Sequence, residues 1–534
     1  MSLDTTINAA ANTPADPSIH KPGTASSDAG ARVLISYNPA TGEKLAELPV
    51  ATEADVAKAI ARAREAFGPW SALSPRERAA RILKARDIFI ARSEQMMDLL
   101  VAEAGKSRMD CYPDIAPISE AIEFYAKNAE KFLADQSIGT RAVAHKRVRT
   151  HLKPRGVVVS LSSYVYPIET SWGPLIPALI AGNVVINKPS ELTPLASLRF
   201  REILVEAGVP EGVVQVLVGG PEVGAMLCRD VDYVVFTGTE ANGKKVGQAC
   251  LDQLIPTSLG LNGKDPAIVL DDAYLDRAVH GAVWGAFFNC GQTCVSVERC
   301  YVVESVYDAF VEGAIELTRK LRQGIDNRFD VDLGCMISEE RLAFVDDQVR
   351  EAVAKGATLR TGGRKSPNFP NGAFYEPTIL TDVNHDMRIM VEETCGPVLP
   401  IMKVRDLDEA VHWANQSKYG LNSSVYTRDL EKGRRVAERL QVGVCNINEC
   451  MVQYCAPEAP FNATKGSGIG GRKGAAAIRR FCHEQTHCED IFNLKREPVW
   501  YPYTRTESEI LQKMVLLLYR TGIGGRIQSL LGRT

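Results

Sequence analysis

The chain lacks several features that would place it in a simple class. Its 534 residues include 62 basic and 65 acidic side chains, so it has no basic excess of the kind typical of nucleic-acid-binding proteins. It has no uninterrupted apolar stretch of about 20 residues, which a membrane-spanning helix needs. Residues 1–31 lack the apolar core of a secretory signal. These absences favour a cytoplasmic protein that neither spans a membrane nor binds nucleic acid.

The cysteines also lack the spacing of a disulfide framework or a zinc site. There are thirteen, an odd number, and no two form a CxxC pair, which fits a reducing compartment. The segment Cys482-His-Glu-Gln-Thr-His-Cys488 is rich in potential ligands, but alternate residues of a strand face opposite sides. We therefore expect no metal. A regulatory disulfide between Cys290 and Cys294, four residues apart, is one alternative to two separate thiols.

What the chain does contain is an α/β pattern with enough apolar residues, 45%, to bury a large core. From Gly156 onward, β-branched apolar runs alternate with helical stretches, which is typical of a parallel sheet with helical crossovers. The expected buried strands are Val157–Leu161, Val184–Ile186, Val213–Val218, Tyr233–Phe236 and Ala267–Leu270. Near the start, Thr52 and Asp55 form the pattern of a helix capping box.

Three short segments carry candidate chemistry, and each has an ordinary structural alternative. Phe288-Asn-Cys-Gly-Gln-Thr-Cys294 offers a nucleophilic cysteine if the thiol ionises at a helix N-terminus, or a buried structural cysteine. Phe236-Thr-Gly-Thr-Glu-Ala-Asn-Gly243 joins an expected strand to a helix, as an anion site or a tight turn does. Asn187-Lys-Pro-Ser-Glu191 places Lys188 and Glu191 to hold ribose hydroxyls, or leaves two exposed charges on a loop. A carboxylate there repels a 2′-phosphate and favours NAD over NADP.

The order of these segments along the chain is more specific than any one of them. The series runs through the motifs Pro154-Arg-Gly, Ala181-Gly-Asn, Gly263-Lys-Asp-Pro266, Gly291-Gln-Thr-Cys294, Glu392-Glu-Thr-Cys-Gly-Pro-Val398, Tyr419-Gly-Leu421 and Gly466-Ser-Gly468. From about residue 34 to 495 it resembles the aldehyde dehydrogenase superfamily. Asn384-His-Asp-Met-Arg-Ile-Met390 and the tail after Tyr501-Pro-Tyr look most like the family 22 branch.

The resemblance implies an α/β fold with a Rossmann-like cofactor domain, an α/β catalytic domain and a β-strand oligomerisation arm that pairs across subunits. The expected organisation is a disordered arm (1–33), an NAD-binding domain (34–259, with part of the arm near 138–153), a catalytic domain (260–450), a return to the cofactor domain with an oligomerisation strand (451–498) and an apolar helical extension (499–534). A homodimer or homotetramer is implied.

The same resemblance assigns roles to individual residues. Cys294 attacks the aldehyde, the resulting thiohemiacetal gives up a hydride to the nicotinamide, and water releases the acid from the thioester. Lys188 and Glu191 hold the adenosine ribose, and Glu393 holds the nicotinamide ribose. Gly238, Thr239 and Gly243 belong to the cofactor-binding turn, with Gly238 and Thr239 under the pyrophosphate.

Three positions depart from the family's pattern. The general-base Glu of Glu-Leu-Gly-Gly-Lys is replaced by Gly260, and Val165 replaces the Asn that donates to the oxyanion. A lost base typically costs about 10²- to 10⁴-fold in rate and a lost oxyanion donor about 10²- to 10³-fold. Cys395 stands where an aromatic residue is expected. As replacements we consider His483 for the base, and Tyr164 or Tyr166 for the missing donor.

The expected function is NAD-dependent oxidation of an aldehyde to a carboxylic acid. Two alternatives stay open: a pseudoenzyme with a structural or regulatory role, and acyl transfer from the thioester to a thiol cofactor. The tail motivates a lipophilic substrate, such as a long-chain, isoprenoid or carotenoid-type aldehyde. In that tail, the apolar residues Ile510, Leu511, Met514, Val515 and Leu518 lie near basic ones. They form either a docking helix or a helix that contacts a membrane surface.

Overall fold

The computed structural model describes residues 24–26, 32–141, 143–492, 495–497 and 499–519, and they fall into two compact units. Most of the chain, up to Phe132 and again from Pro154 to Phe481, belongs to the first unit. Leu133–Lys153 and the residues from Cys482 onward belong to the second. Residues 1–23 and 27–31 of the predicted N-terminal arm lie outside the described residues.

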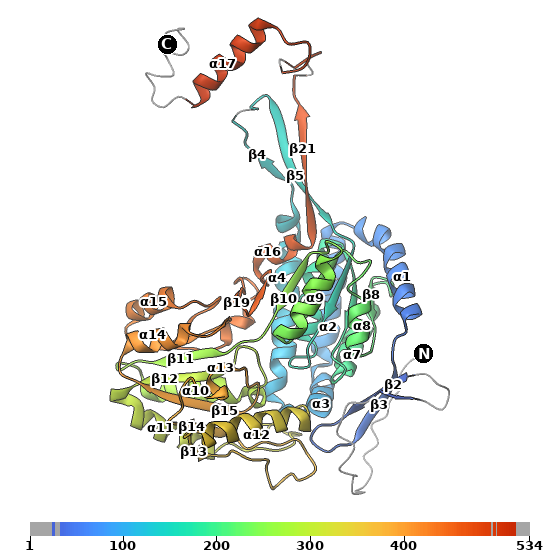
Figure 1. The fold of residues 1–534 in the computed structure, drawn as a ribbon. Helices are drawn as coiled ribbons and strands as arrows, with labels where there is room; N and C mark the ends of the chain where they lie inside the picture. The colour runs from blue at the N-terminus through green and yellow to red at the C-terminus, as the bar shows by residue number, and fades with distance from the viewer. Residues whose placement is uncertain (1–23, 27–31, 142, 493–494, 498, 520–534) are drawn as a thin grey trace. The chain divides into compact units, whose positions relative to one another are not determined.

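A six-stranded sheet forms the core of the cofactor-type half of the first unit (Figure 1). Its strand order is β20-β10-β9-β6-β7-β8, parallel except for β20. Every residue of β6 and β7 is buried, which explains the apolar runs with which both strands begin. The bounds are β6 (Val157–Leu161), β7 (Val184–Lys188), β8 (Val214–Val216), β9 (Tyr233–Thr237), β10 (Thr257–Gly260) and β20 (Gly468–Ile469).

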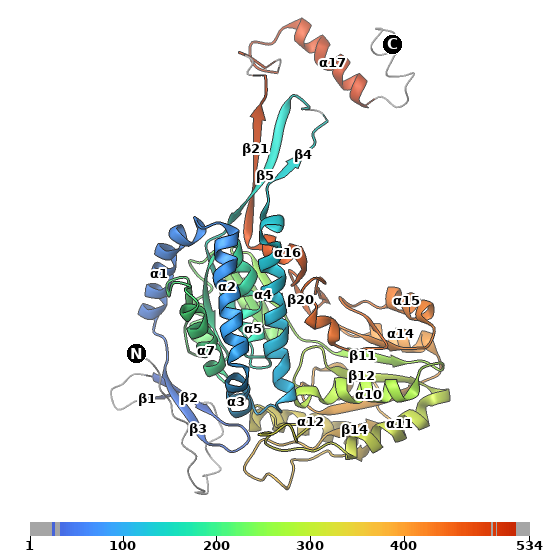
Figure 2. The same ribbon diagram turned by 180° about the vertical axis from the view of Figure 1, so that it is seen from behind.

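Helices cover both faces of this sheet. Figures 1 and 2, seen from opposite sides, show α9 over one face and α2 and α4 over the other. The predicted capping box at Thr52 and Asp55 is confirmed at the start of α1. The helices of this half are α1 (Glu53–Ser71), α2 (Pro75–Ala91), α3 (Ser93–Ala104), α4 (Tyr112–Leu133), α5 (Glu169–Trp172), α6 (Leu175–Ala181), α7 (Pro194–Glu206), α8 (Pro221–Met226), α9 (Glu240–Leu251) and α16 (Gly474–Arg480).

A seven-stranded sheet forms the second half of the first unit, in the order β13-β14-β15-β12-β11-β17-β18. All its pairs are parallel except β13 with β14. The strands are β11 (Asp265–Val269), β12 (Val297–Val303), β13 (Thr358–Thr361), β14 (Thr378–Thr381), β15 (Val398–Val404), β17 (Ser424–Tyr426) and β18 (Asn446–Ile447). The helices are α10 (Leu275–Phe287), α11 (Glu304–Arg319), α12 (Glu339–Ala354), α13 (Arg388–Val391), α14 (Leu407–Asn415) and α15 (Leu430–Arg439). The predicted α/β class is confirmed.

Smaller elements complete the first unit. A three-stranded sheet at the N-terminus contains β1 (Thr24–Ser26), β2 (Arg32–Tyr37) and β3 (Lys44–Pro49). Strands β16 (Tyr419–Gly420) and β19 (Thr464–Lys465) pair with each other. Three short 3₁₀ helices are η1 (Met109–Cys111), η2 (Phe288–Gly291) and η3 (Val452–Cys455).

The second unit is a three-stranded sheet with a helix. Its strand order is β21-β5-β4, with β4 (Gln136–Ile138), β5 (Lys146–Pro154) and β21 (Cys482–Asp490). Helix α17 (Arg505–Tyr519) follows in the chain and has no buried residue. Among the described residues, no helix is long and apolar enough to cross a membrane. The predicted helical extension is therefore seen in part, because residues 520–534 lie outside the described residues.

Candidate active site

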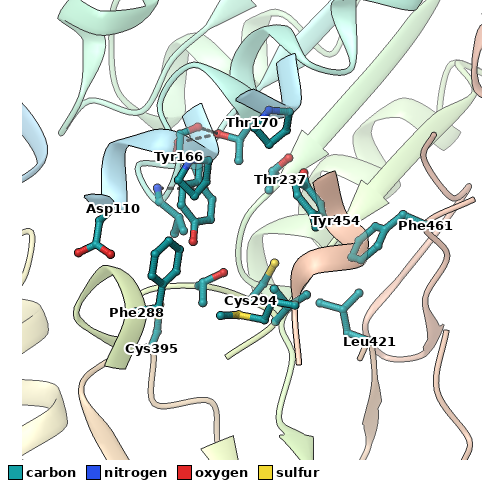
Figure 3. A pocket seen from close by; sticks show the side chains of 18 of the residues that line it. Asp110, Tyr166, Thr170, Thr237, Phe288, Cys294, Cys395, Leu421, Tyr454 and Phe461 are labelled. Carbon is teal, nitrogen blue, oxygen red and sulfur yellow. Dashed lines mark hydrogen bonds between the residues drawn. The ribbon is translucent and has the colours of Figure 1, made fainter. Parts of the chain in front are cut away.

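A cavity of about 820 Å³ lies where the two halves of the first unit meet, and Cys294 lines it. Figure 3 shows the Cys294 side chain between one wall that contains Tyr454 and Phe461 and another that contains Tyr166 and Phe288. Most of the lining is apolar or aromatic. The turn after β9, with Gly238 and Thr239, also reaches this cavity.

The loop that presents Cys294 is held in an unusual backbone conformation. Asn289, Cys290 and Gly291 have φ values of 54°, 56° and 68°, in the left-handed region that disfavours most side chains. Buried polar contacts stabilise this turn: Asp110 Oδ1 accepts from the Asn289 N–H at 3.0 Å, and Lys106 Nζ donates to Asn289 Oδ1 at 3.0 Å. The loop then runs into β12, so Cys294 does not begin a helix and the expected helix-terminus effect on its thiol is absent.

The Cys294 thiol is in a protected environment. Burial raises its pKa to about 12, and the nearby carboxyl groups of Glu393 and Asp265 act in the same direction. Arg472 opposes them and lowers the pKa. The thiol is thus predominantly protonated at neutral pH in the absence of bound molecules, and formation of the nucleophilic thiolate requires stabilisation of negative charge at this position.

The cofactor-type turn has the strand–turn–helix form that the sequence predicts. Thr239 is the N-cap of α9, and its side chain accepts from the Asn242 N–H. Gly243 lies in the first turn of α9, where an added Cβ would come within 2.3 Å of Leu261 Cδ2. A larger residue at this position would require the Leu261 side chain to move. The amides at this helix N-terminus suit the pyrophosphate of a dinucleotide.

Lys188 and Glu191 lie together at the end of β7, outside the residues that line the main cavity. The Lys188 Nζ is 3.6 Å from Glu191 Oε2 and donates to the Pro189 carbonyl at 2.7 Å. Burial lowers the pKa of Lys188, whereas Glu191 opposes this shift. The Lys188 ammonium, as donor, and the Glu191 carboxylate, as acceptor, suit the hydroxyl groups of a ribose. Together with the Gly238–Thr239 turn, these are the residues that would hold a nicotinamide dinucleotide.

Glu393 lines the cavity. It accepts hydrogen bonds from the segment Gly260–Lys264, in which Gly260 replaces the expected base. Its carboxylate accepts from the Gly263 N–H at 2.9 Å and from the Asn262 side-chain amide. Burial, together with the charge of Glu298, raises the pKa of Glu393 to about 7. Gly263, which donates to Glu393, also lies beside Cys294, because an added Cβ at Gly263 would be 2.1 Å from the Cys294 carbonyl oxygen. Glu393 is therefore near Cys294.

The three departures from the family pattern have distinct structural consequences. Beside Gly260 lies the guanidinium of Arg472: an added Cβ at 260 would be 2.7 Å from its Nη2. Val165 lines the cavity, and its carbonyl accepts from Lys106 Nζ at 2.8 Å. Cys395 contacts the Tyr164 hydroxyl, with Oη and Sγ 3.8 Å apart. Of the two tyrosines considered as oxyanion donors, Tyr164 thus already has a partner in Cys395.

The predicted base His483 is not brought to this cavity. It lies on β21 in the second unit, where it is exposed, and it is not among the residues that line the cavity. Segment Cys482–Cys488 lies in β21. Successive side chains of a strand face opposite sides, so the potential ligands of this segment do not share one face. Cys290 and Cys294 are both free thiols, so the alternative of a disulfide between them is not observed.

Comparison with known proteins agrees with this arrangement. The model of the aldehyde dehydrogenase family matches residues 25–487. The chain belongs to this family. It is 36% identical over 484 residues to a Mycobacterium ulcerans protein named as an NADP-dependent succinate-semialdehyde dehydrogenase, a match that covers 90% of this chain and 92% of that protein. It is also 36% identical to a betaine aldehyde dehydrogenase of Vibrio vulnificus, over 84% of this chain and 92% of the relative.

Solved aldehyde dehydrogenases have the same fold. The crystal structure of a Mycobacterium tuberculosis aldehyde dehydrogenase complexed with NAD⁺ superimposes with a TM-score of 0.81 at 33% identity, covering 85% of this chain and 94% of that one. The fold is thus aldehyde dehydrogenase-like, as predicted. The finer resemblance to the family 22 branch stays a prediction.

Two cavity residues, Asp110 and Arg472, had no role in the sequence-based analysis of this aldehyde dehydrogenase. Asp110 has one buried oxygen without a hydrogen-bond partner, and burial raises its pKa to about 6. Arg472 follows the glycine-rich motif Gly466-Ser-Gly468, and a basic residue after that motif was the one signal for it. Its position next to Gly260 depends on contacts distant in sequence.

Proposed function

We propose that this protein oxidises a lipophilic aldehyde to the carboxylic acid with NAD as acceptor. The observation that carries this proposal is Cys294, a thiol in a largely apolar cavity that the Gly238–Thr239 turn also lines. Bound NAD supplies a nicotinamide ring that accepts the hydride. The protein supplies the nucleophile Cys294, orients the aldehyde against it and excludes bulk water.

The apolar lining supports the substrate class. Aromatic and aliphatic side chains that line the cavity are also exposed to solvent: Met109, Tyr112, Trp284 and Val452. Exposed apolar groups at a ligand cavity favour apolar ligands. A long-chain, isoprenoid or carotenoid-type aldehyde fits this lining better than a short polar one.

The carboxylate of Glu191 supports NAD over NADP, because it would repel a 2′-phosphate. The names of relatives differ on this point: the Mycobacterium ulcerans relative is named as NADP-dependent, and the Mycobacterium tuberculosis structure contains NAD⁺. We also propose a homodimer or homotetramer that forms through the β21-β5-β4 sheet. The exposure of β21 from His483 to Asp490 supports this, since an edge strand can pair with another chain. The thirteen free cysteines support a cytoplasmic location.

The decisive test is NADH formation with a panel of aldehydes: acetaldehyde, succinate semialdehyde and a C₁₂ aldehyde. We expect kcat/KM to be highest for the C₁₂ aldehyde and higher with NAD than with NADP, and we expect Cys294→Ala to abolish the reaction. Equal kcat/KM for acetaldehyde and the C₁₂ aldehyde would contradict the substrate class.

The same assay separates the alternative functions. A wild-type protein no faster than Cys294→Ala on every aldehyde would be a pseudoenzyme. Rapid thioester formation with slow release of acid, accelerated by an added thiol, would indicate acyl transfer. Neither alternative has a structural observation in its favour.

A further inference from the structure

The guanidinium of Arg472 fills the space that a side chain at position 260 would occupy. An added Cβ at Gly260 would lie 2.7 Å from Nη2 and 3.0 Å from Cζ of Arg472. A side chain at 260 and the guanidinium in its present position therefore exclude each other. Where the family pattern places a negative carboxylate beside the cysteine, this chain has a positive guanidinium.

The guanidinium is held by hydrogen bonds to neutral groups, and the buried carboxyl group of Glu169 interacts with it electrostatically. Nη2 donates to the Phe236 carbonyl at 3.1 Å and to Thr237 Oγ1 at 2.6 Å. The Arg472 backbone forms two hydrogen bonds with Phe461, of 2.6 and 2.7 Å. Among the described residues, no carboxylate forms an ion pair with Arg472, and its Nε and Nη1 have no hydrogen-bond partner. An arginine that keeps its charge and two donors in a largely apolar cavity is suited to stabilise an anion.

The anion that would need stabilisation in this cavity is the thiolate of Cys294. Arg472 and Cys294 line the same cavity, together with Thr237, Tyr454 and Phe461, which are labelled with the cysteine in Figure 3. Arg472 is also the group that lowers the pKa of Cys294 against burial and the nearby carboxyls. The other arginine that lines the cavity, Arg341, donates to the Thr394 carbonyl at 2.9 Å and lies by Tyr164 and Cys395 instead.

We propose that Arg472 is a positioning residue that stabilises the anionic form of Cys294, and that Gly260 is required to make room for it. For catalysis this rests on the proposed function. The Cys294 thiol gives its proton to solvent, the sulfur forms a bond to the aldehyde carbon, and the carbonyl electron pair moves to oxygen. Bound NAD⁺ would take up the hydride and be reduced as the aldehyde is oxidised, which would restore that carbonyl as a thioester. Water then cleaves the carbon–sulfur bond, which yields the acid and returns the thiol.

The test is the rate of Cys294 alkylation by iodoacetamide between pH 6 and 10, without aldehyde or cofactor, measured by mass spectrometry of the Cys294 peptide. Only the thiolate reacts, so the rate reports the ionised fraction. We expect Arg472→Gln to slow alkylation up to about tenfold at pH 8, since loss of one nearby opposite charge typically changes a pKa by about one unit. Arg472→Lys is expected to restore most of the rate, because the positive charge is kept.

Two further variants guard against a purely structural effect. Gly260→Ala keeps Arg472 but requires its guanidinium to shift, so it is expected to slow alkylation less than Arg472→Gln does. Arg341→Gln removes a positive charge elsewhere in the cavity and is expected to leave the pH profile of Cys294 unchanged. The Tm of each variant shows whether it is folded.

A wild-type pH profile in both Arg472→Gln and Gly260→Ala would overturn the proposal, as would an equal slowing by Arg341→Gln. The outcome is independent of the proposed function. If Arg472→Gln slows alkylation but the wild type oxidises no aldehyde, the inference stands and the dehydrogenase proposal fails. If the wild type oxidises aldehydes and the alkylation profile does not depend on Arg472, the reverse holds.

Discussion

Glu103 is a carboxyl group buried away from the cavity, where it joins two segments of the first unit. It is fully buried, and its two oxygens accept from the N–H groups of Leu195 at 2.6 Å and Ala196 at 3.0 Å, at the start of α7. Burial raises its pKa from 4.5 to about 8, although these hydrogen bonds oppose the shift. The folded protein therefore holds a proton on Glu103 that the unfolded chain releases above about pH 4.5.

This proton has a measurable effect on stability. Because the folded state binds more protons than the unfolded state between about pH 4.5 and 8, the contribution of Glu103 to the free energy of unfolding is largest below pH 4.5 and decreases as pH rises to about 8. The decrease is about 1 kcal/mol per pH unit. We expect Glu103→Gln to have a lower Tm than wild type at pH 5, since it lacks one acceptor oxygen, but a smaller fall in Tm from pH 5 to 8.

Thermal unfolding at pH 5, 6, 7 and 8 measures this, with the exposed substitution Glu65→Gln as control. Parallel Tm curves for wild type and Glu103→Gln would show that the group is ionised in the folded protein.

Among individual residues, those that the sequence identified as candidate site residues lie in continuous motifs. Gly238, Thr239, Glu393 and Cys294 were named from local patterns, and the structure brings them to one cavity. Their roles stay predictions. The role of Arg472 could not be predicted, because it depends on the space left by Gly260 at the end of β10, which is distant in sequence. His483 was selected because Phe481-Cys-His-Glu484 falls roughly where many relatives place a second glutamate, and nothing in its sequence neighbourhood showed that its strand belongs to another unit.

The loop that presents Cys294 depends on a conformation that its sequence only partly explains. Gly291 has φ of 68°, and an added Cβ would be 2.1 Å from the Gly396 carbonyl oxygen. Since that contact is with backbone, it cannot be relieved by a side-chain rotation. The last residue of η2 and the segment that carries Glu393 and Cys395 are thus packed directly against each other.

We expect Gly291→Ala to reduce kcat at least tenfold and to lower the stability by about 2 kcal/mol or more, because it combines backbone strain with a backbone clash. Gly356→Ala is a matched control: its φ is also positive, at 105°, but an added Cβ has nothing within 4 Å. It is expected to keep full activity and to lose only about 1 kcal/mol. Steady-state kinetics and Tm measure both. Similar kinetics for the two variants would contradict the role of the Gly291–Gly396 contact.

The elements that were predictable are those with a strong local signal. Strands β6, β7 and β9 each contain an apolar run, because helices cover both faces of their sheet. Strand β20 has only two residues, and its pairing with β10 at Leu259–Ile469 and Gly260–Gly468 is a contact distant in sequence. No local pattern distinguishes such a strand from a loop.

The whole molecule is less easily derived from sequence than its parts. The resemblance implied an arm near residues 138–153 and a strand after 451, and the structure has β5 and β21 in one sheet of the second unit. Helix α17, in the same unit, leaves apolar side chains exposed, among them Ile510, Met514 and Val515. We propose that this helix contacts a membrane surface.

Co-sedimentation with vesicles of phosphatidylcholine and phosphatidylserine tests this contact. Wild type is expected to bind, and Met514→Glu is expected to bind severalfold less, since it places a charge on the apolar face. Ser508→Glu adds the same charge at an exposed polar position of α17 and is expected to bind like wild type. Absence of wild-type binding would contradict the proposal, and a smaller mass by light scattering for Met514→Glu would point to docking on a sister subunit.

The late return of the chain to its first sheet has a consequence for biosynthesis. Strand β20 and Arg472 come from a segment that leaves the ribosome only after the whole seven-stranded sheet has been synthesised. A nascent chain that ends before Gly468 leaves the β10 edge uncovered and has no cation next to Gly260. The cofactor-type half, although it is translated first, is therefore completed after the half with the seven-stranded sheet. A truncated translation product would expose the uncovered edge of β10 to other nascent chains.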